Sequence, residues 1–282
     1  RDLTANGGLG ARAFFHPELQ SALLSAAEQA GATVVRGATV TGFSRTPGPQ
    51  RLHAVEARAN GAAADHLARL VIGADGRSSR ARVWGGFAVN ADPEKLMFSG
   101  VLLAGARVGF TEHESDTAHV FFAPSTGLLA MVLPLGGRRT RAYVGYHLAR
   151  GRRRLSGAAA FPEFRQLSEE AGVPPDWSDG AEVAGPLAQF SGADTWVDEA
   201  YSRGVALVGD AAAASDPSFG CGMALAMRGS RQLTDELLRA GSFEQDAIDD
   251  AGAAYAEQAS RDFGSLHRQI SWLADVYREP GT

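Results

Sequence analysis

The segment that most constrains the fold is residues 204–229, which read G-V-A-L-V-G-D-A-A-A-A-S-D-P-S-F-G-C-G-M-A-L-A-M-R-G. Residues 205–208 have the length and β-branched content of a buried strand, and Gly209-Asp210 ends that strand abruptly. A proline and two glycines then open an Ala-, Met- and Leu-rich segment of helical character, at Pro217, Gly220 and Gly222. The predicted order is therefore strand, acidic turn, glycine-rich loop and helix.

A loop of this kind favours an anionic or electron-rich ligand. Helix N-termini leave backbone N–H groups unpaired and carry partial positive charge. Glycines let a ligand approach the backbone, and the carboxylate of Asp210 can accept hydrogen bonds from ligand hydroxyl groups. The segment is not a P-loop, because no Gly-Lys-Ser/Thr follows. The alternative is an ordinary β-loop-α crossover whose glycines serve packing.

The spacing G-D-A-A-x-x-x-x-P-x-x-G-x-G resembles the second flavin motif of FAD-dependent aromatic hydroxylases, the para-hydroxybenzoate hydroxylase-like (group A) monooxygenases. The matching positions are Gly209, Asp210, Ala211, Ala212, Pro217, Gly220 and Gly222. The chain departs from the family pattern at Ala213, where His is common, and at Ala224, where Asn is common. The resemblance implies that this loop binds FAD, with Asp210 on the ribityl chain.

A second motif lies at residues 73–82, which read G-A-D-G-R-S-S-R-A-R. It matches the D-G-x-x-S-x-x-R pattern of the same family at Asp75, Gly76, Ser79 and Arg82. In that family the motif approaches the dinucleotide half of FAD and the nicotinamide donor. The resemblance therefore implies cofactor binding here, with arginine charge suited to pyrophosphate or NADPH. A solvated basic turn is the alternative for Arg77 and Arg80.

The activity that the resemblance implies is that of an FAD-dependent oxidoreductase, most specifically an NAD(P)H-dependent monooxygenase. Such an enzyme hydroxylates an aromatic or polyketide-like small molecule with O₂ through a flavin C4a-hydroperoxide. The implied catalytic residues are Pro217, near the reacting edge of the flavin, and Gly220 and Gly222, whose backbone stabilises charge at its pyrimidine edge. The implied cofactor-binding residues are Asp75, Gly76, Arg82, Gly209, Asp210, Ala211, Pro217, Gly220, Cys221, Gly222 and Met223.

Two alternatives stand beside the monooxygenase. Flavin-dependent halogenases and prenyl reductases share the flavin fold but carry W-x-W-x-I-P and Y-x-W-x-F-P, where residues 129–134 read L-A-M-V-L-P. This difference favours a hydroxylase. The other alternative is a non-catalytic flavoprotein fragment, because the first flavin motif, G-x-G-x-x-G after a strand, is not found. Residues 8–13 fit G-x-G-x-x-A, but no strand-like segment precedes them. We expect the chain to begin inside a longer protein.

The composition is that of a soluble globular protein, with 45% hydrophobic and 21% charged residues among 282. A net charge of −5 argues against a nucleic-acid partner. Cys221 is the only cysteine, which excludes an internal disulfide and favours a reducing, cytoplasmic setting. No apolar stretch is long enough to span a membrane. No two of the seven histidines have metal-ligand spacing, so no metal is assigned.

The expected fold class is α/β (α+β), with an FAD-binding Rossmann-like domain, an antiparallel β-sheet substrate domain and C-terminal helices. The expected domains are 1–92, part of the FAD-binding domain; 93–190, the substrate domain; 191–242, the FAD-binding domain continued; and 243–282, a helical segment. The substrate-domain sheet is expected to roof the flavin, and its apolar residues suggest an apolar or aromatic ligand: Phe121, Phe122, Met131 and Leu133.

Periodicity predicts the individual elements. A buried amphipathic helix is expected from His16 to about Gly31, because a proline follows its first residue and leucines recur on one face. A further helix is expected over 161–172, and helices after the glycine-rich loop over 231–240 and 243–277. The expected strands are 33–36, 38–43, 52–59 and 68–73, followed by the antiparallel strands 100–108, 119–123, 127–135 and 141–147.

Overall fold

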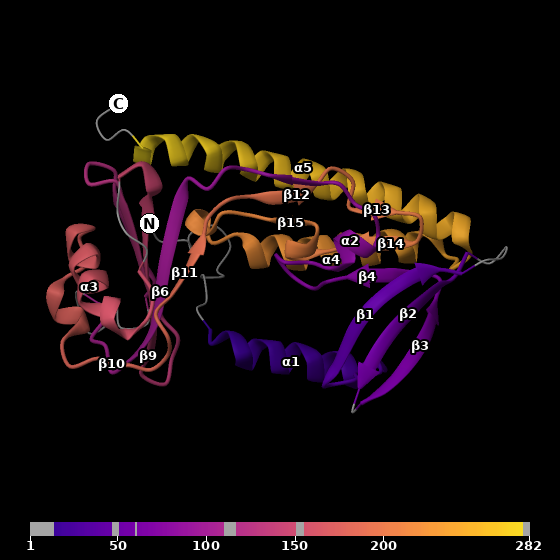
Figure 1. The fold of residues 1–282 in the computed structure, drawn as a ribbon, viewed down its shortest axis with the longest axis horizontal. Helices are drawn as coiled ribbons and strands as arrows, with labels where there is room; N and C mark the ends of the chain where they lie inside the picture. Colours follow the sequence, from indigo (N-terminus) through magenta and orange to yellow (C-terminus); the bar gives the residue numbers. More distant parts are fainter. Residues whose placement is uncertain (1–13, 47–50, 60, 110–116, 151–154, 279–282) are drawn as a thin grey trace. The chain divides into compact units, whose positions relative to one another are not determined.

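The structure is a computed structural model that describes residues 14–46, 51–59, 61–109, 117–150 and 155–278 (Figure 1). The chain divides into two compact units. Unit 1 comprises the described residues of 1–34, 95–191 and 274–282, and unit 2 those of 35–94 and 192–273. The boundaries at 94/95 and 191/192 lie within a few residues of the predicted 92/93 and 190/191, whereas those at 34/35 and 273/274 were not predicted. The division into functional domains stays a prediction.

Unit 1 is built on a six-stranded antiparallel sheet of order β10-β6-β9-β8-β7, in which β11 also pairs with β6. Its strands are β6 (Leu96–Ala104), β7 (His119–Ala123), β8 (Leu128–Pro134), β9 (Arg139–His147), β10 (Glu182–Val183) and β11 (Ala188–Ser191). Its helices are α1 (His16–Gln29), α3 (Phe161–Glu170) and the 3₁₀ helices η3 (Leu148–Arg150), η4 (Ala158–Ala160) and η5 (Pro175–Ser178).

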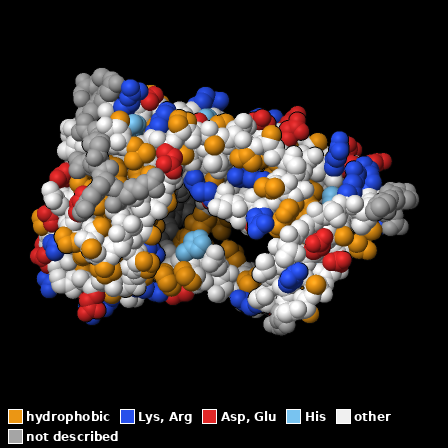
Figure 2. Space-filling view, in the orientation of Figure 1, with side chains coloured by type: hydrophobic (Ala, Val, Ile, Leu, Met, Phe, Trp, Pro, Cys, Tyr) orange, Lys and Arg blue, Asp and Glu red, His pale blue; other side chains and the backbone are white. Residues whose placement is uncertain are grey.

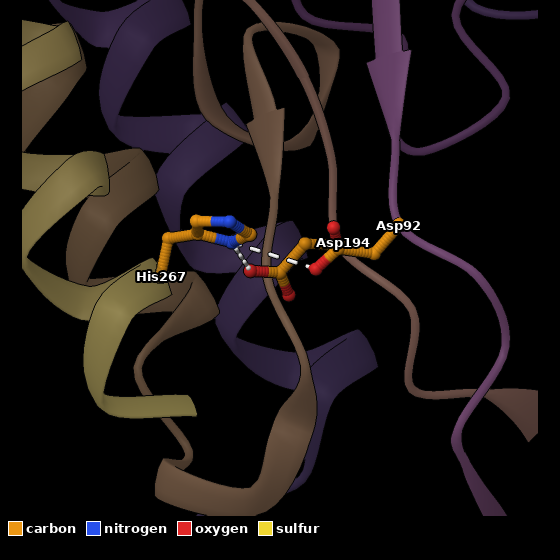
Figure 3. A group of neighbouring side chains, drawn as sticks. All are labelled: Asp92, Asp194 and His267. Atoms are coloured by element: carbon orange, nitrogen blue, oxygen red, sulfur yellow. Dashed lines mark hydrogen bonds and ion pairs between the residues drawn. The ribbon is translucent and has the colours of Figure 1, made fainter. Parts of the chain in front are cut away.

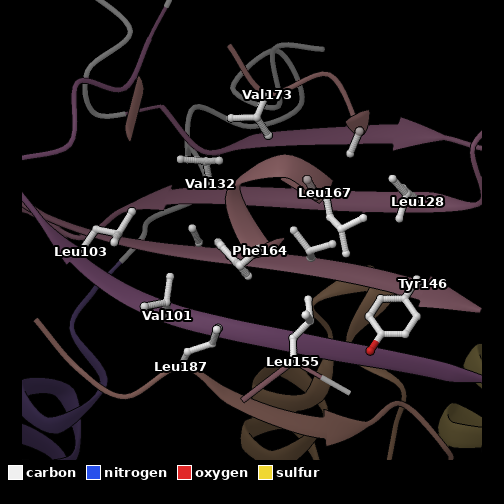
Figure 4. Close-up of a cluster of buried hydrophobic side chains, with 14 of the residues drawn as sticks. Val101, Leu103, Leu128, Val132, Tyr146, Leu155, Phe164, Leu167, Val173 and Leu187 are labelled. Atoms are coloured by element: carbon white, nitrogen blue, oxygen red, sulfur yellow. The ribbon is translucent and has the colours of Figure 1, made fainter. Parts of the chain in front are cut away.

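The core of unit 1 lies between this sheet and α3 (Figure 4). Alternate residues of β6, among them Val101 and Leu103, point to the same face because side chains alternate along a strand. Phe164 and Leu167 of α3 meet them from the helix side and are almost fully buried. Each such side chain contributes about 1.5–3 kcal/mol when it is removed from water.

Unit 2 contains three small sheets. The first is the antiparallel meander β1 (Ala38–Arg45), β2 (His53–Ala59) and β3 (Ala62–Ala68). The second has the order β13 (Tyr201–Ser202), β14 (Val205–Leu207) and β4 (Val71–Gly73), and the third the order β15 (Ala213–Ala214), β12 (Thr195–Val197) and β5 (Val89–Ala91). The helical elements of unit 2 are α2 (Ala81–Trp84), η6 (Gly209–Ala211), η7 (Pro217–Phe219), α4 (Gly222–Ala240) and most of α5 (Gln245–Arg278).

The core of unit 2 centres on β14, whose three residues are all buried. Leu233 of α4 and Ile248 and Tyr255 of α5 pack in the same cluster. The Tyr255 hydroxyl donates a hydrogen bond to the carbonyl of Leu207 at 2.6 Å. Helix α5 is thereby fixed to the strand that delivers the Gly209-Asp210 turn.

The surface mixes both signs of charge. On the face in Figure 2, Lys and Arg side chains are interspersed with Asp and Glu side chains. Among the described residues, no helix has both the length and the hydropathy needed to cross a membrane.

The predicted fold class is confirmed, since antiparallel sheets, a parallel strand pair and C-terminal helices are all present. The helix predicted from His16 exists, but its predicted burial is wrong. None of its residues is buried and Leu23 is 51% exposed, because the described residues cover its leucine face only in part. The strand predicted at 33–36 is also wrong, because these residues have no ladder partner among those described.

Other predicted boundaries shift. The strand predicted at 100–108 is β6, which begins at Leu96, and the helix predicted at 231–240 is the end of α4, which begins at Gly222. The strand predicted at 68–73 shortens to β4, in which Ile72 is 49% exposed. The G-x-G-x-x-A match at 8–13 lies outside the described residues.

Candidate functional site

The two sequence motifs meet where two parallel strands end. Strand β14 pairs with β4 in parallel, with Leu207 opposite Gly73, and the amide of Val208 donates to the carbonyl of Gly73 at 2.9 Å. A Cβ on Gly73 would lie 2.6 Å from the Cβ of Ala81, so only glycine fits there. The turns that carry Asp75 and Asp210 therefore leave the same sheet edge, where open α/β sheets bind ligands.

The carboxylate of Asp75 is hydrogen-bonded to residues of its own motif. Its carboxylate accepts hydrogen bonds from the Ser79 hydroxyl at 2.5 Å and from the amides of Arg80 and Ala81 at 2.7 and 3.0 Å. Burial alone would raise the pKa of this carboxyl, but these hydrogen bonds outweigh it and hold the pKa below its ordinary value. Asp75 thus stays ionised and fixes the start of α2. Gly76 beside it has a φ of 80° and open space around its α-carbon.

Arg82 joins the second motif to the first. Its side chain is buried, and its guanidinium donates from Nε to the carbonyl of Ala211 at 2.6 Å and from Nη2 to that of Asp210 at 2.5 Å. Arg77 acts similarly, donating to the carbonyls of Ala193 at 2.6 Å and Ser215 at 3.0 Å. Both guanidinium groups position backbone. This role was not predicted from the sequence, which indicated instead that the positive charge of these arginines binds a cofactor.

We call residues 209–222 the site loop. Gly209 has a φ of 57°, and a Cβ there would lie 3.0 Å from the Cβ of Ala226 in α4. Ala211 is fully buried. Asp216 caps η7, since its carboxylate accepts hydrogen bonds from the Ser218 amide, at 2.8 Å, and hydroxyl. Gly220 ends this turn at a φ of 63°, in the left-handed region that favours glycine.

Helix α4 begins directly after this turn and leaves its N-terminus accessible. Cys221, the N-cap residue, makes no side-chain cap, and no acidic residue stands in the first turn. Met223 is 38% exposed. A 19-residue helix with an uncapped N-terminus presents partial positive charge and unpaired N–H groups to a ligand.

Two polar side chains lie close to the α-carbon of Gly222, and we call the place between them and this glycine the notch. The carboxylate Oδ1 of Asp210 lies 3.9 Å and the hydroxyl of Ser215 4.0 Å from the position that a Cβ on Gly222 would take. The Ser215 hydroxyl is buried and finds no hydrogen-bond partner among the described residues. Buried polar groups are nearly always paired, so this atom indicates a missing partner. Ser215 was not singled out from the sequence.

A second group missed by the sequence is the cluster of Asp92, Asp194 and His267 (Figure 3). The side chain of Asp194 is fully buried, and its Oδ2 lies 2.7 Å from Nδ1 of His267 on α5. Asp194 Oδ1 accepts the amide of Asp216 at 2.6 Å, and Asp92 Oδ2 lies 3.7 Å from the same His267 nitrogen. No spacing rule could find residues 73 positions apart.

This cluster offers three ligand atoms within 4.8 Å of one another, enough in geometry for a cation. Hydrogen bonds already account for the arrangement. Asp194 Oδ2 bonds directly to His267 Nδ1, and Asp194 Oδ1 accepts the amide of Asp216. We therefore assign it no metal.

Unit 1 carries an aromatic face on the side of its sheet opposite the core. Phe98 and Phe190 stack with their ring centroids 5.9 Å apart, and Tyr143 meets Phe190 edge-on at 6.3 Å. Glycines make room for the rings, since a Cβ on Gly100 would lie 2.5 Å from the Tyr143 ring and one on Gly145 2.6 Å from the Phe98 ring. Phe190 is 39% exposed.

Of the predicted apolar sheet residues, Phe121 packs against the unit 1 core, so it is not on the aromatic face. Phe122 is 52% exposed and points to the opposite side of β7.

Comparison with known proteins gives one family and many similar structures. The model of a family described as "FAD binding domain" matches residues 12–259. No curated protein sequence matches the chain.

Three similar solved structures are enzymes by their printed names, and two of those names describe flavin-dependent enzymes. The flavin-dependent halogenase CmlS has a TM-score of 0.69 and 18% identity, over 88% of this chain and 44% of that chain. The flavin-dependent brominase Bmp2 has a TM-score of 0.74 and 13% identity, over 94% and 65%. OxyS anhydrotetracycline hydroxylase from Streptomyces rimosus has a TM-score of 0.59 and 14% identity, over 92% and 54%. At these identities the likeness shows the fold, and the chain spans 44% to 65% of the length of these structures.

Proposed function

The chain belongs to the family of FAD-binding domains, and from that premise we propose that it forms the FAD-binding part of an NAD(P)H-dependent monooxygenase that hydroxylates an aromatic or polyketide-like small molecule. The observation that carries the proposal is the notch at Gly222, where a helix N-terminus, a carboxylate and an unpartnered buried hydroxyl converge.

The residues of the notch fit the flavin half of FAD. A ribityl chain brings hydroxyl groups that can donate to Asp210 and pair with the Ser215 hydroxyl, which otherwise stays unsatisfied. The uncapped start of α4 suits the electron-rich pyrimidine edge of a flavin. The proposed cofactor-binding residues are Asp75, Gly76, Arg82, Gly209, Asp210, Ala211, Pro217, Gly220, Cys221, Gly222 and Met223, with Pro217, Gly220 and Gly222 closest to the chemistry.

When bound, FAD supplies two-electron redox chemistry and, once reduced, reaction with O₂. The chain's own residues bind and orient. Arg82 holds the Gly209–Ala211 turn by its carbonyls, so Asp75 and Arg82 act on a cofactor mainly through the backbone that they fix. The N–H groups at the start of α4 hold negative charge without reorganisation. Arg80, stacked at 5.4 Å over Trp84, keeps an exposed guanidinium that suits a nicotinamide dinucleotide phosphate.

The aromatic face of unit 1 supports an aromatic substrate. Phe190, which is 39% exposed, offers ring surface that can stack on a planar molecule, and the buried Phe98 ring and the half-buried Tyr143 ring hold it in place. The name of one similar structure, anhydrotetracycline hydroxylase, supports hydroxylation as the reaction.

The test begins with the purified chain. We expect it to bind FAD with a change in the flavin's visible spectrum, and we expect the bound flavin to be reduced by NADH or NADPH under anaerobic conditions. Reaction with isotopically labelled O₂ and a panel of aromatic compounds should then give a product heavier by one labelled oxygen atom. A chain that binds no FAD contradicts the proposal, whatever its activity.

A halogenase is the second candidate, because two of the similar structures are a halogenase and a brominase. Strand β8 carries L-A-M-V-L-P in place of the tryptophan-rich halogenase segment, which favours the hydroxylase. The same assay with added chloride or bromide separates the two, because a halogenase yields a product whose mass carries the halogen isotope pattern.

A further inference from the structure

A continuous hydrogen-bonded path runs from helix α5 to the site loop. His267 Nδ1 bonds to the buried carboxylate of Asp194 at 2.7 Å, and the other oxygen of that carboxylate accepts the amide of Asp216 at 2.6 Å. Asp216 in turn caps η7 through Ser218. Two residues after η7, helix α4 begins with the notch at Gly222. The path thus ends at Ser218, four positions before the proposed flavin contact at Gly222.

Asp194 can couple the position of His267 to that of the site loop, because its side chain and backbone are held by their surroundings. Its side chain is fully buried, its carbonyl accepts the amide of Asp92 at 2.9 Å, and Arg77 binds the carbonyl of the preceding Ala193 at 2.6 Å. Arg77 also binds the carbonyl of Ser215 at 3.0 Å, so both ends of the contact between Asp194 and the loop are held.

His267 is held in one orientation by its neighbours. The centroid of its ring lies 4.7 Å from the ring centroid of Trp196 and 5.6 Å from that of Phe263. The ring also lines a cavity of about 110 Å³ together with Ala212 and Ala213 of the site loop. Because Asp194 already accepts one amide, the hydrogen bond from Nδ1 of His267 is what pairs its second oxygen.

From this geometry we infer that Asp194 and His267 are positioning residues for the flavin: by ordering residues 216–222 they hold the N-terminus of α4 and the notch at Gly222 ready for the cofactor. The inference rests on the proposed function for its cofactor half. The other half, which we call the loop half, is that Asp194 and His267 order residues 216–222. It concerns the chain alone, because the order of the site loop can be measured without FAD.

Three variants of α5 test the inference. His267→Phe keeps a ring against Trp196 and Phe263 but removes the donor. His267→Asn keeps a donor near the place of Nδ1. Gln269→Ala, at an exposed position on the same helix, is the matched control.

The loop half is measured by amide hydrogen exchange of the cofactor-free chain. In His267→Phe we expect exchange at Asp216 and Ser218 to rise at least about tenfold. The amide of Val208, bonded to Gly73, is the internal reference and should not change. A purely structural role would instead raise exchange at Val208 as well and lower the unfolding temperature in proportion. His267→Asn should resemble the parent.

The cofactor half is measured by FAD titration. We expect the dissociation constant to rise roughly tenfold in His267→Phe and to stay near the parent value in His267→Asn and Gln269→Ala. Unchanged exchange at Asp216 in His267→Phe overturns the inference, as does faster exchange with unchanged FAD affinity.

Two further outcomes remain decisive. Should His267→Phe not fold, His267→Asn and His267→Gln are compared: protection of Asp216 in the first and its loss in the second supports the inference, and equal behaviour overturns it. A parent chain that binds no FAD refutes the proposed function and the cofactor half, while the exchange data still decide the loop half.

Discussion

Ser215 and Asp216 are neighbours in the site loop whose buried side chains are satisfied differently. Asp216 accepts the amide and hydroxyl of Ser218, whereas the Ser215 hydroxyl has no partner among the described residues. Burial raises the pKa of the Asp216 carboxyl to about 6, with a smaller contribution from the charge of Asp194 and opposing hydrogen bonds from Ser218. Adjacent positions of the loop therefore hold a carboxyl with a raised pKa and a buried hydroxyl whose partner is not among the described residues.

A first prediction concerns the charge of Asp216. The folded pKa of about 6 lies above the ordinary value of 3.8, so the folded state binds the proton more tightly. The contribution of this carboxyl to the free energy of unfolding should be most favourable below about pH 4 and be lost as pH rises to about 6. Asp216→Asn keeps an acceptor for Ser218 and loses the charge, so it should be more stable at pH 7, by on the order of 2 kcal/mol.

Urea unfolding between pH 4 and pH 8 measures this effect. Glu199→Gln, which neutralises an exposed carboxylate in the same unit, is the control, and its difference in stability from the parent should change little with pH. A difference between Asp216→Asn and the parent that is the same at both ends of the range contradicts the prediction.

A second prediction concerns the notch. A methyl group at Gly222 meets only ordinary contacts, so Gly222→Ala should fold with a stability within about 1 kcal/mol of the parent. The same methyl fills the space between Asp210 and Ser215, and the FAD dissociation constant should rise at least about tenfold. Fluorescence titration measures the affinity. Gly220→Ala, which strains a left-handed turn without filling the notch, separates strain from occlusion. FAD affinity unaffected by Gly222→Ala would place the flavin elsewhere.

At this scale the sequence predicted what is local. The glycines, Pro217 and Asp210 fall where the turn chemistry indicated, because turn geometry depends on residues a few positions apart. It missed the acceptors of Arg82, which lie almost 130 positions away, and the pairing of Asp194 with His267. Such partners depend on how distant segments pack.

Among the elements, the parallel pair of β4 and β14 carries both motifs and is braced by α2. Arg82, on α2, binds the turn that follows β14, and Asp75, after β4, fixes the start of α2. Each of the three elements is thus linked to the other two, by strand pairing or by these hydrogen bonds. The sequence predicted the two strands from their apolar runs but did not predict α2. It also predicted a strand at 33–36 from the same signal, because a run cannot show whether a partner strand lies beside it.

A third prediction tests this brace. Arg82→Ala leaves the buried carbonyls of Asp210 and Ala211 without their donors and should lower the free energy of unfolding by about 2–4 kcal/mol. Arg82→Lys should recover only part, since one ammonium cannot replace a planar fork. Arg80→Ala removes a stacked, exposed guanidinium and should cost less than about 1 kcal/mol. Equal losses for Arg82→Ala and Arg80→Ala in chemical denaturation would argue against the brace.

A fourth prediction concerns the sheet of unit 1. A Cβ at Gly145 would lie 2.6 Å from the Phe98 ring, so Gly145→Ala should destabilise the chain by about 1–3 kcal/mol through overpacking. Adding Phe98→Leu should restore part of that loss, because the smaller side chain makes room. Thermal unfolding of the single and double variants measures the coupling. Strictly additive effects would show that ring and glycine do not compete for the same space.

For the whole molecule, the two units hold different parts of the proposed function. Unit 2 holds the site loop, both motifs and the cluster of Asp92, Asp194 and His267, whereas unit 1 holds the aromatic face. The sequence predicted strands β6 to β9 and the longer helices, but not the short strands β5, β10, β11, β12, β13 and β15. The assignment of α1 to unit 1 did not, because its apolar periodicity indicates a face to be covered but not what covers it.

A fifth prediction follows for the whole chain. FAD at about a hundred times its dissociation constant should stabilise the chain by about 2.7 kcal/mol. Hydrogen exchange with and without FAD should show protection that starts at the site loop and at the ends of β4 and β14. Strands β8 and β9 serve as the reference within unit 1. Protection that begins in β8 and β9 and spares the site loop would contradict our placement of the cofactor.

The parallel register of β4 and β14 has a consequence for biosynthesis. Val71 pairs with Val205, more than 130 residues later, whereas β8 pairs with its neighbours β7 and β9 across short turns. At about 5–20 residues per second, a ribosome needs roughly 7–27 s to deliver the partner of β4. During that interval β4 lacks its partner β14, while the hairpins of β7, β8 and β9 can already close. The proposed ligand site is thus completed only after these hairpins have been synthesised.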